Sequence, residues 1–154
     1  MTPHHNDPSL IRDRLQTPAT WAIVGLSDNA DRTAHRIAYW LGQELGMRLV
    51  PIHPRAVSVH GARGYATLSD VPDDVVVKVV DCFVNSTLVG DVVDQAIAQR
   101  DRLGIEALWL QLGVIDEAAA ARAEAAGLGV VMDTCPKIEY PRIQPGDAAS
   151  AVTG

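Results

Sequence analysis

The amino-acid sequence predicts an α/β fold, a doubly wound sheet of parallel strands flanked by helices on both faces. Short apolar runs alternate with helical patterns along the chain, and strands separated by helices run parallel with right-handed crossovers. The first run, Trp21 to Val24, breaks at Gly25 and gives way to a helical pattern. Ligands of such sheets bind at the carboxyl ends of the strands, so the loops after the runs are the candidate functional segments.

The first helix and the second strand follow directly from this junction. The spacing predicts a helix that is capped by Thr33 and ends at Gly46, and then a strand over residues 49–52. An irregular connection with a short strand near Tyr65 comes next. The apolar face of this helix is formed by Ile37, Ala38, Leu41 and Leu45.

The second half of the chain continues the alternation. Residues 75–83 read as a buried central strand, 107–110 and 130–132 as further strands, and 116–126 as an alanine-rich helix. A helix behind the central strand is predicted from the apolar positions Leu88, Val92, Ala96 and Ile97.

Length and composition predict a single domain. A chain of 154 residues with 47% hydrophobic content can bury a core without disulfides. We expect a flexible N-terminal segment over residues 1–17, the folded domain over 18–142, and a flexible tail over 143–154, where glycine, alanine and serine are frequent.

Charge and targeting signals restrict the partners. A net charge of −6 argues against nucleic acid and against an anionic membrane surface, because both favour a basic face. No apolar run is long enough to span a membrane and no signal peptide is evident, so we expect a cytoplasmic protein. Two cysteines are typical of reduced thiols, and the histidines lack the spacing of a metal site.

The turn after the first strand makes a nucleotide-bearing ligand the leading hypothesis. A strand, a turn and a helix N-terminus direct unpaired backbone N–H groups and the positive end of a helix dipole at one point, where a phosphate can bind. Domains that bind NAD carry three glycines in this turn and an acidic residue after the second strand. This chain has only Gly25 and then His53-Pro54-Arg55, and an arginine there suits a ribose phosphate, as in NADP or coenzyme A.

Several segments, in this order and spacing, carry a resemblance to a known family. Over roughly residues 18–140 the chain resembles the small stand-alone CoA-binding proteins, which are similar in fold to the CoA-binding N-terminal domain of the succinyl-CoA synthetase alpha subunit. The segments are Gly25-Leu26-Ser27 with Arg32-Thr33, Pro51-Ile52-His53-Pro54, Gly61 with Tyr65-Ala66-Thr67-Leu68, Trp109-Leu110-Gln111-Leu112-Gly113-Val114, and Val131-Met132-Asp133-Thr134-Cys135.

The resemblance implies a Rossmann-like domain that binds coenzyme A. We expect it to act on coenzyme A or an acyl-CoA as a carrier, sensor or regulatory module, because the sequence shows no catalytic constellation and no metal-site spacing. Gly25 and Ser27 would lie at the phosphates and Pro54 beside the nucleotide. From the resemblance and from the places of the residues in the predicted loops, the expected ligand-binding set is Gly25, Leu26, Ser27, Asp28, Arg32, Thr33, His53, Pro54, Arg55, Phe83, Asn85, Gln111 and Leu112.

The chain departs from the family at three positions. His53 stands where the family usually has asparagine, and Val84 and Asn85 stand where it usually has arginines. Each charge-assisted hydrogen bond lost to a phosphate is worth roughly 1.5 to 3 kcal/mol, so weaker binding or a different ligand is predicted. The alternatives are an NADP-dependent oxidoreductase and a protein-interaction domain with a degenerate nucleotide pocket. A homodimer or a protein partner is left open.

Two further residues are interpreted from their predicted places, and one substitution is predicted. Gln111 at a strand end either contacts the ligand or caps the backbone, and Cys135 reads as a buried thiol rather than one that exchanges with a coenzyme thiol. A valine in place of Gly25 is expected to fill the ligand's approach path and to leave the fold largely intact.

Overall fold

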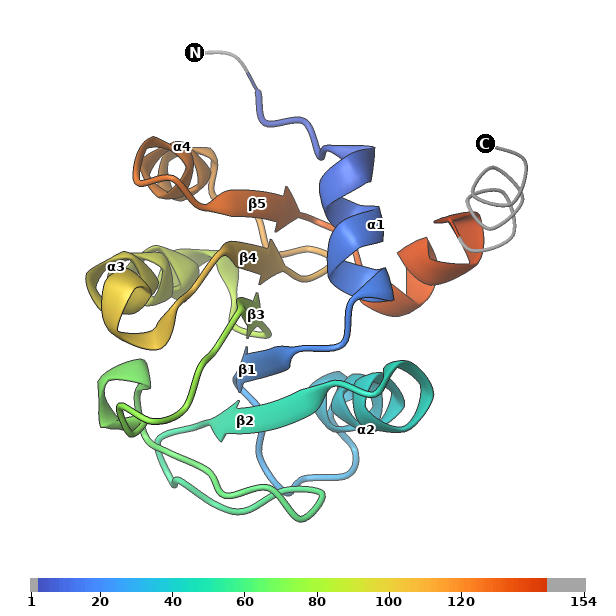
Figure 1. Ribbon diagram of the computed structural model, residues 1–154, viewed down its shortest axis with the longest axis vertical. Helices are drawn as coiled ribbons and strands as arrows, with labels where there is room; N and C mark the ends of the chain where they lie inside the picture. The colour runs from blue at the N-terminus through green and yellow to red at the C-terminus, as the bar shows by residue number, and fades with distance from the viewer. Residues whose placement is uncertain (1–2, 144–154) are drawn as a thin grey trace.

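A computed structural model describes residues 3–143 and contains one sheet of five parallel strands. The order across the sheet is β2-β1-β3-β4-β5, so the chain runs outward from β1 to β2 and then crosses back to β3 (Figure 1). This confirms the predicted α/β, Rossmann-like, doubly wound architecture. The strands are β1 (Thr20–Val24), β2 (Arg48–Ile52), β3 (Val79–Cys82), β4 (Ala107–Leu110) and β5 (Gly129–Met132).

Helices cover both faces of the sheet (Figure 1). One face packs against α1 (Pro8–Gln16), α2 (Thr33–Leu45) and the helical residues 136–143. The opposite face packs against α3 (Ser86–Leu103) and α4 (Glu117–Ala125), with the short 3-10 helix η1 (Leu68–Asp70) beside α3. Within residues 3–143, no helix combines the length and the apolar character needed to cross a membrane.

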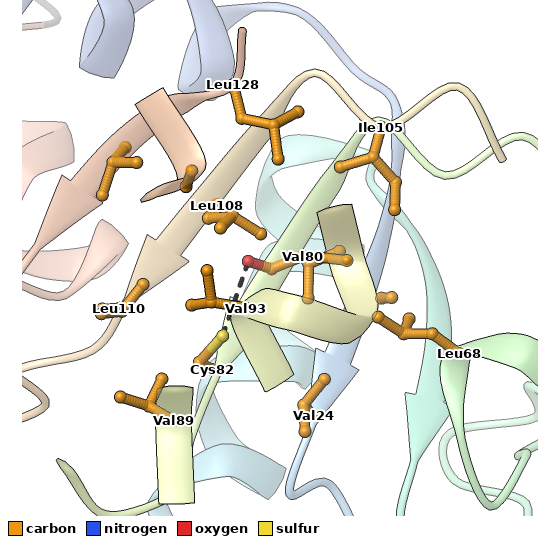
Figure 2. Packing of buried hydrophobic residues seen from close by; sticks show 14 of the residues in the cluster. Val24, Leu68, Val80, Cys82, Val89, Val93, Ile105, Leu108, Leu110 and Leu128 are labelled. Atoms are coloured by element: carbon orange, nitrogen blue, oxygen red, sulfur yellow. Dashed lines mark hydrogen bonds between the residues drawn. The ribbon is translucent and has the colours of Figure 1, made fainter. Parts of the chain in front are cut away.

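The strands are buried on both sides because their side chains alternate between two apolar layers. From β3, Val80 and Cys82 enter the layer beneath α3 and α4, where they meet Leu108 and Leu110 of β4 (Figure 2). From the same strand, Val79 enters the layer beneath α1 and α2. The two layers explain why the central runs of the sequence are continuously apolar.

The apolar face of α3 agrees only in part with the predicted one. The expected Ala96 is buried, and Val92 and Ile97 pack partly buried against the core, but Leu88, which was also expected there, is 53% exposed. Val89, Val93 and Leu103 are buried instead. The helix begins after Asn85, whose side chain accepts a hydrogen bond from the N–H of Thr87. Because apolar residues occur on both of these neighbouring stripes, spacing alone did not fix which stripe faces the sheet.

The segment before β1 contains a helix where the sequence suggested a flexible start. Asp7 caps α1 by accepting a hydrogen bond from the N–H of Ser9, and Pro8 occupies the first helical position. Ile11 and Leu15 bury their side chains against the sheet. These short signals, a cap followed by proline and two apolar residues, are the ones that the sequence interpretation missed.

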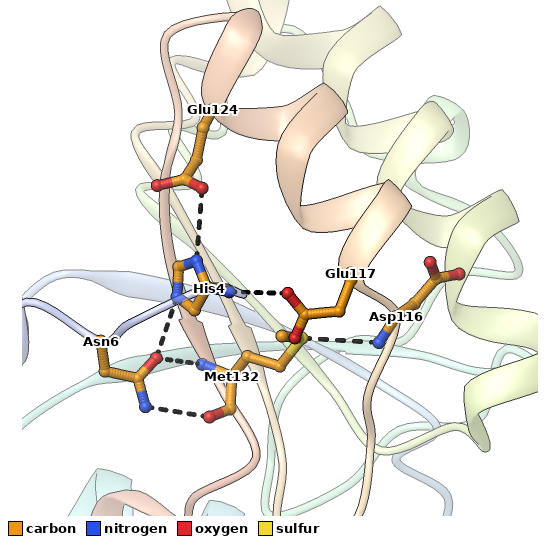
Figure 3. Close-up of polar contacts among 6 residues, drawn as sticks. All are labelled: His4, Asn6, Asp116, Glu117, Glu124 and Met132. Carbon is orange, nitrogen blue, oxygen red and sulfur yellow. Dashed lines mark hydrogen bonds and ion pairs between the residues drawn. The ribbon is translucent and has the colours of Figure 1, made fainter. Parts of the chain in front are cut away.

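The residues before α1 are tied to the β5 edge by Asn6 and His4 (Figure 3). The Asn6 amide donates to the Met132 carbonyl at 2.9 Å and accepts from the Met132 N–H at 2.8 Å, as a neighbouring strand would do. The His4 imidazole lies 3.2 Å from the Glu124 carboxylate on α4, and the backbone N–H of His4 donates to the Glu117 carboxylate. One edge of the sheet is thereby covered.

The opposite edge, β2, is closed by Pro51 and Tyr65. Pro51 has no N–H to offer to another strand, and its carbonyl accepts from the Tyr65 N–H at 2.9 Å. The strand expected near Tyr65 is therefore an isolated bridge to Ile52. This bridge fixes the far end of the segment 53–67, which leaves β2 and returns to it.

A carboxyl group lies in the middle of the sheet. Asp81 of β3 is fully buried; its Oδ1 accepts from the Gln111 side-chain N–H at 2.8 Å, and its Oδ2 has no partner among the described residues. Burial raises the pKa of Asp81 to about 8, against a smaller lowering by the Gln111 hydrogen bond. The folded protein therefore holds this carboxyl protonated at neutral pH.

This burial predicts that stability falls as the pH rises. The folded-state pKa of Asp81 lies above its ordinary value of 3.8, so its contribution is complete below pH 4 and is lost as the pH rises toward about 8, on the order of 1 kcal/mol per pH unit. In urea unfolding, the stability of wild type relative to Asp81→Asn should be higher at pH 5 than at pH 8. Parallel pH dependence in the two proteins would contradict this account.

Candidate functional site

The order of the strands reverses between β1 and β3, and a cleft lies at the carboxyl ends of these two strands. The loop after β1 leads to α2 on one face, and the loop after β3 leads to α3 on the other, so the two loops part. A cleft of about 1110 Å³ lies between them. This is the topological switch point, where open α/β sheets bind their ligands.

The floor of the cleft is formed by a close approach of two backbones. Gly25 has φ +96°, and a Cβ built on it would lie 2.5 Å from the Phe83 carbonyl oxygen. The Gly25 N–H donates to Ile52 and the Phe83 N–H donates to Val24. Glycine is thus required for the fold at this position, and the expectation that Gly25→Val would leave the fold intact is wrong.

The turn after Gly25 is held by a series of short side-chain hydrogen bonds. The buried Ser27 hydroxyl accepts from the Asn29 N–H at 3.2 Å, and the Asn29 side chain accepts from the Asp31 N–H at 3.0 Å. Such side-chain turns order a loop without regular secondary structure. Ser27, Asn29 and Asp31 all line the cleft.

The start of α2 points into the cleft without a side-chain cap. Arg32, rather than the expected Thr33, occupies the N-cap position, and its side chain makes no capping hydrogen bond. The first turn contains no acidic residue. Arg32, Thr33 and Ala34 line the cleft, so this helix end presents backbone N–H groups and the positive end of its dipole there.

The segment after β2 forms the adjoining wall. His53, Pro54 and Arg55 line the cleft, and the His53 ring accepts from the Arg55 N–H at 3.2 Å. The Arg55 guanidinium lies 3.3 Å from the Asp28 carboxylate, and both side chains are about 60% exposed. An exposed pair of this kind is worth little, so Arg55 can exchange Asp28 for a ligand phosphate at small cost.

The opposite wall comes from the start of α3. Phe83 and Asn85 line it, but the Asn85 side chain is engaged in capping α3. Leu88, Asp91 and Gln95 also line the cleft from α3. Sequence reasoning missed these three, although their spacing along a helix places them on one face. The exposed Leu88 presents an apolar side chain to the cleft.

Four residues of the expected set do not line the cleft. Leu26 is buried in the layer beneath α2, Asp28 is paired with Arg55, and Leu112 is 63% exposed on the loop after β4. Gln111 is buried and donates to Asp81, which explains why its amide is unavailable to a ligand in this conformation.

Two other conspicuous residues belong to the core. The Trp109 indole is buried and donates to the Thr134 carbonyl at 2.8 Å. Cys135 is buried, and burial raises the pKa of its thiol, which favours the unreactive form.

Charge is distributed unevenly around the cleft. Residues 32–63 carry five arginines and one glutamate, a formal charge of +4, in a chain whose net charge is −6. This segment comprises α2, β2 and most of the segment 53–67, which together line one side of the cleft. The α3 wall contributes Asp91 instead. An anionic group is therefore favoured on the α2 side.

Comparison with known proteins gives the family of this chain. Residues 19–141 match the model of the CoA binding domain family. The chain belongs to the CoA binding domain family. The match confirms the resemblance that the loop motifs indicated.

The relatives include free-standing proteins and one part of a larger enzyme. Uncharacterized protein YneT of Bacillus subtilis (strain 168) is 27% identical over 130 residues, which cover 84% of this chain and 91% of YneT. A hypothetical protein from Pyrococcus horikoshii OT3 is 29% identical, with a TM-score of 0.77, over 92% of this chain and 98% of its own.

The third relative is the dinucleotide forming acetyl-coenzyme A synthetase 1 of Ca. Korarchaeum cryptofilum, solved in complex with phosphate and ADP. It is 26% identical, with a TM-score of 0.64, over 77% of this chain. The match covers only 26% of the synthetase chain. The domain therefore occurs both alone and within a synthetase.

The close approach at the cleft floor gives a prediction for Gly25. Gly25→Ala should destabilise the protein by clearly more than the roughly 1 to 2 kcal/mol expected from a positive φ alone, because its Cβ also collides with the Phe83 backbone. Gly46→Ala is the matched control, since Gly46 has φ +71° and a Cβ at that position would meet nothing within 4 Å. If urea unfolding shows that the two variants lose equal stability, contact between the added Cβ and the Phe83 backbone does not destabilise the protein.

Proposed function

We propose that this protein binds coenzyme A or an acyl-CoA in the cleft at the ends of β1 and β3, and acts as a carrier, sensor or regulatory module without turnover of its own. The observation that carries the proposal is the uncapped start of α2 beside Gly25, within a chain of the CoA binding domain family. The ligand is a polyanion, and this wall supplies the positive potential that a polyanion requires.

The end of β2 supports a phosphorylated ribose. NAD sites place a carboxylate there to bind ribose hydroxyls, whereas this chain places His53 and Arg55 at the cleft. A guanidinium binds a phosphate through paired charge-assisted hydrogen bonds. Coenzyme A carries such a phosphate at the ribose 3′ position, so we assign Arg55 to it.

The surroundings of Ser27 support binding without catalysis. A serine nucleophile needs a base within hydrogen-bond reach. In the part of the chain that the structure describes, the partner of the Ser27 hydroxyl is the Asn29 N–H, and no imidazole or carboxylate bonds to it. The hydroxyl is therefore better suited to donate to a phosphate than to attack a substrate.

Calorimetric titration with three ligands under one buffer condition tests the proposal. Coenzyme A should bind more tightly than its 3′-dephospho form and more tightly than NADP. A preference for NADP would favour the oxidoreductase alternative. If all three ligands fail to bind, the proposal is wrong and the degenerate-pocket, protein-interaction alternative gains support.

Arg55 provides the residue-level prediction. Arg55→Ala should weaken coenzyme A by about 1 kcal/mol, or about fivefold, and should leave 3′-dephospho-coenzyme A nearly unchanged, because only the former carries the contacted phosphate. Arg63→Ala is the matched control. Arg63 lies in the same segment, but its guanidinium lies 5.3 Å from the centroid of the Tyr65 ring, and it lines a separate groove beside Arg48 instead of the cleft. Equal losses for both ligands would exclude the assignment of Arg55.

A further inference from the structure

The segment 53–67 forms part of the cleft at both of its ends. His53, Pro54 and Arg55 line the cleft where the segment leaves β2, and Ala66 and Thr67 line it where the segment returns. Between these ends the chain extends along α2, whose first turn is the neighbouring wall. Whatever fixes the middle of the segment to α2 also fixes the geometry of two walls.

The middle of the segment is a tight turn with histidine at an unfavourable position. Val59 and Ala62 exchange two backbone hydrogen bonds, at 3.0 and 2.9 Å, around His60 and Gly61, which have φ +51° and +78°. A turn with two such residues strongly prefers Asn-Gly. Retaining histidine costs backbone strain, and strain kept in a native structure points to a use for the side chain.

The His60 side chain is bound to α2. Its Nε2 lies 2.8 Å from the backbone carbonyl oxygen of His35, and because a carbonyl only accepts, Nε2 must carry the proton and donate. The His60 ring also contacts two rings of α2 in tilted arrangements, with centroids 4.2 Å from His35 and 5.2 Å from Tyr39. The nearby Val59 is buried beneath α2 and adds an anchor that does not titrate.

We propose that His60 is a positioning residue that latches the segment 53–67 to α2, and that acid opens this latch by charging His35 beneath the His60 ring, which loosens the cleft. The effect on ligand rests on the proposed function. The latch itself rests only on the contacts of His60. Opening would move the His53–Arg55 wall away from the start of α2 and so release a bound coenzyme A more readily in acid.

The charged groups around His35 and His60 determine whether the latch opens in acid or in base. Burial and the facing His60 lower the pKa of His35; Asp28 raises it and Arg36 lowers it. The His35 pKa is thus below its ordinary value, so the latch is complete above pH 6.5 and is lost as the pH falls. The His60 ring, whose centroid lies 4.2 Å from that of His35, disfavours the charged form of His35. Along the adjoining groove, Arg48 and Arg63 add positive charge and Asp74 opposes it.

Substitution of His60 separates the latch from the turn. His60→Asn removes the ring and supplies the residue that the turn prefers, so without a latch the segment should become more rigid. We expect the opposite: hydrogen exchange of peptides covering residues 55–66, measured at pH 7.5 by mass spectrometry, should accelerate about fivefold. His5→Asn, the same change at an exposed histidine outside the cleft, is the control. Unchanged or slower exchange in His60→Asn would overturn the latch.

A second variant tests the acid response. His35→Phe keeps a ring beneath His60 and keeps the backbone carbonyl that accepts its hydrogen bond, but it cannot become charged. After correction for intrinsic exchange rates, wild type should open between pH 7.5 and 5.5, whereas His35→Phe should stay closed. An equal response of the two proteins would overturn the acid switch.

Affinity measurements distinguish this proposal from the proposed function. Coenzyme A should bind several-fold more weakly to His60→Asn than to wild type at pH 7.5. If the segment opens but the affinity is unchanged, the positioning role is wrong. If wild type does not bind coenzyme A at all while exchange responds as expected, the latch stands and the proposed function fails.

Discussion

Gly25 and Phe83 approach each other so closely at the ends of β1 and β3 that no Cβ fits between them. Both backbones continue the hydrogen-bonded sheet, and each then turns to a different face. The cleft exists because the loops after β1 and β3 lead to opposite faces of the sheet. Backbone atoms form its floor because position 25 carries no side chain. The floor of the cleft and the integrity of the sheet therefore depend on the same glycine.

The electrostatic character of the cleft follows from how the topology groups the charges. An acidic chain is a poor general binder of anions, but the fold collects α2, β2 and the segment 53–67, with their excess of arginine, on one side. The uncapped start of α2 adds its dipole to the same wall. An anionic group is therefore favoured on this side of the cleft, although the chain as a whole carries a net charge of −6.

The sheet was predictable because buried parallel strands leave continuous apolar runs, and glycines mark the ends of α2 and α3. The helix α1 at the start of the chain was not predictable, because it adds only two buried side chains to a core formed largely by the rest of the domain. The exposure of Leu88 on α3 has a similar cause: Leu88 and Val89 are equally apolar, and only the packing on β3 selects Val89.

The cleft was predictable where a residue's place in the chain decides its role. Gly25, Thr33 and Arg55 follow strands or begin a helix, and the structure brings them together. Gln111 also follows a strand, but the buried Asp81 lies next to it and binds its amide, a long-range pairing that no local pattern contains. The same holds for the His60 latch, whose partner is 25 residues away along the chain.

The central claim is that the cleft at the ends of β1 and β3 holds coenzyme A. The most direct test is a titration of isotope-labelled protein with coenzyme A, followed by backbone amide chemical shifts. The account predicts the largest changes at residues 25–34, 53–55 and 83–85, with little change in the groove beside Arg48 and Arg63. Changes centred on that groove, or none at a saturating concentration, would contradict it.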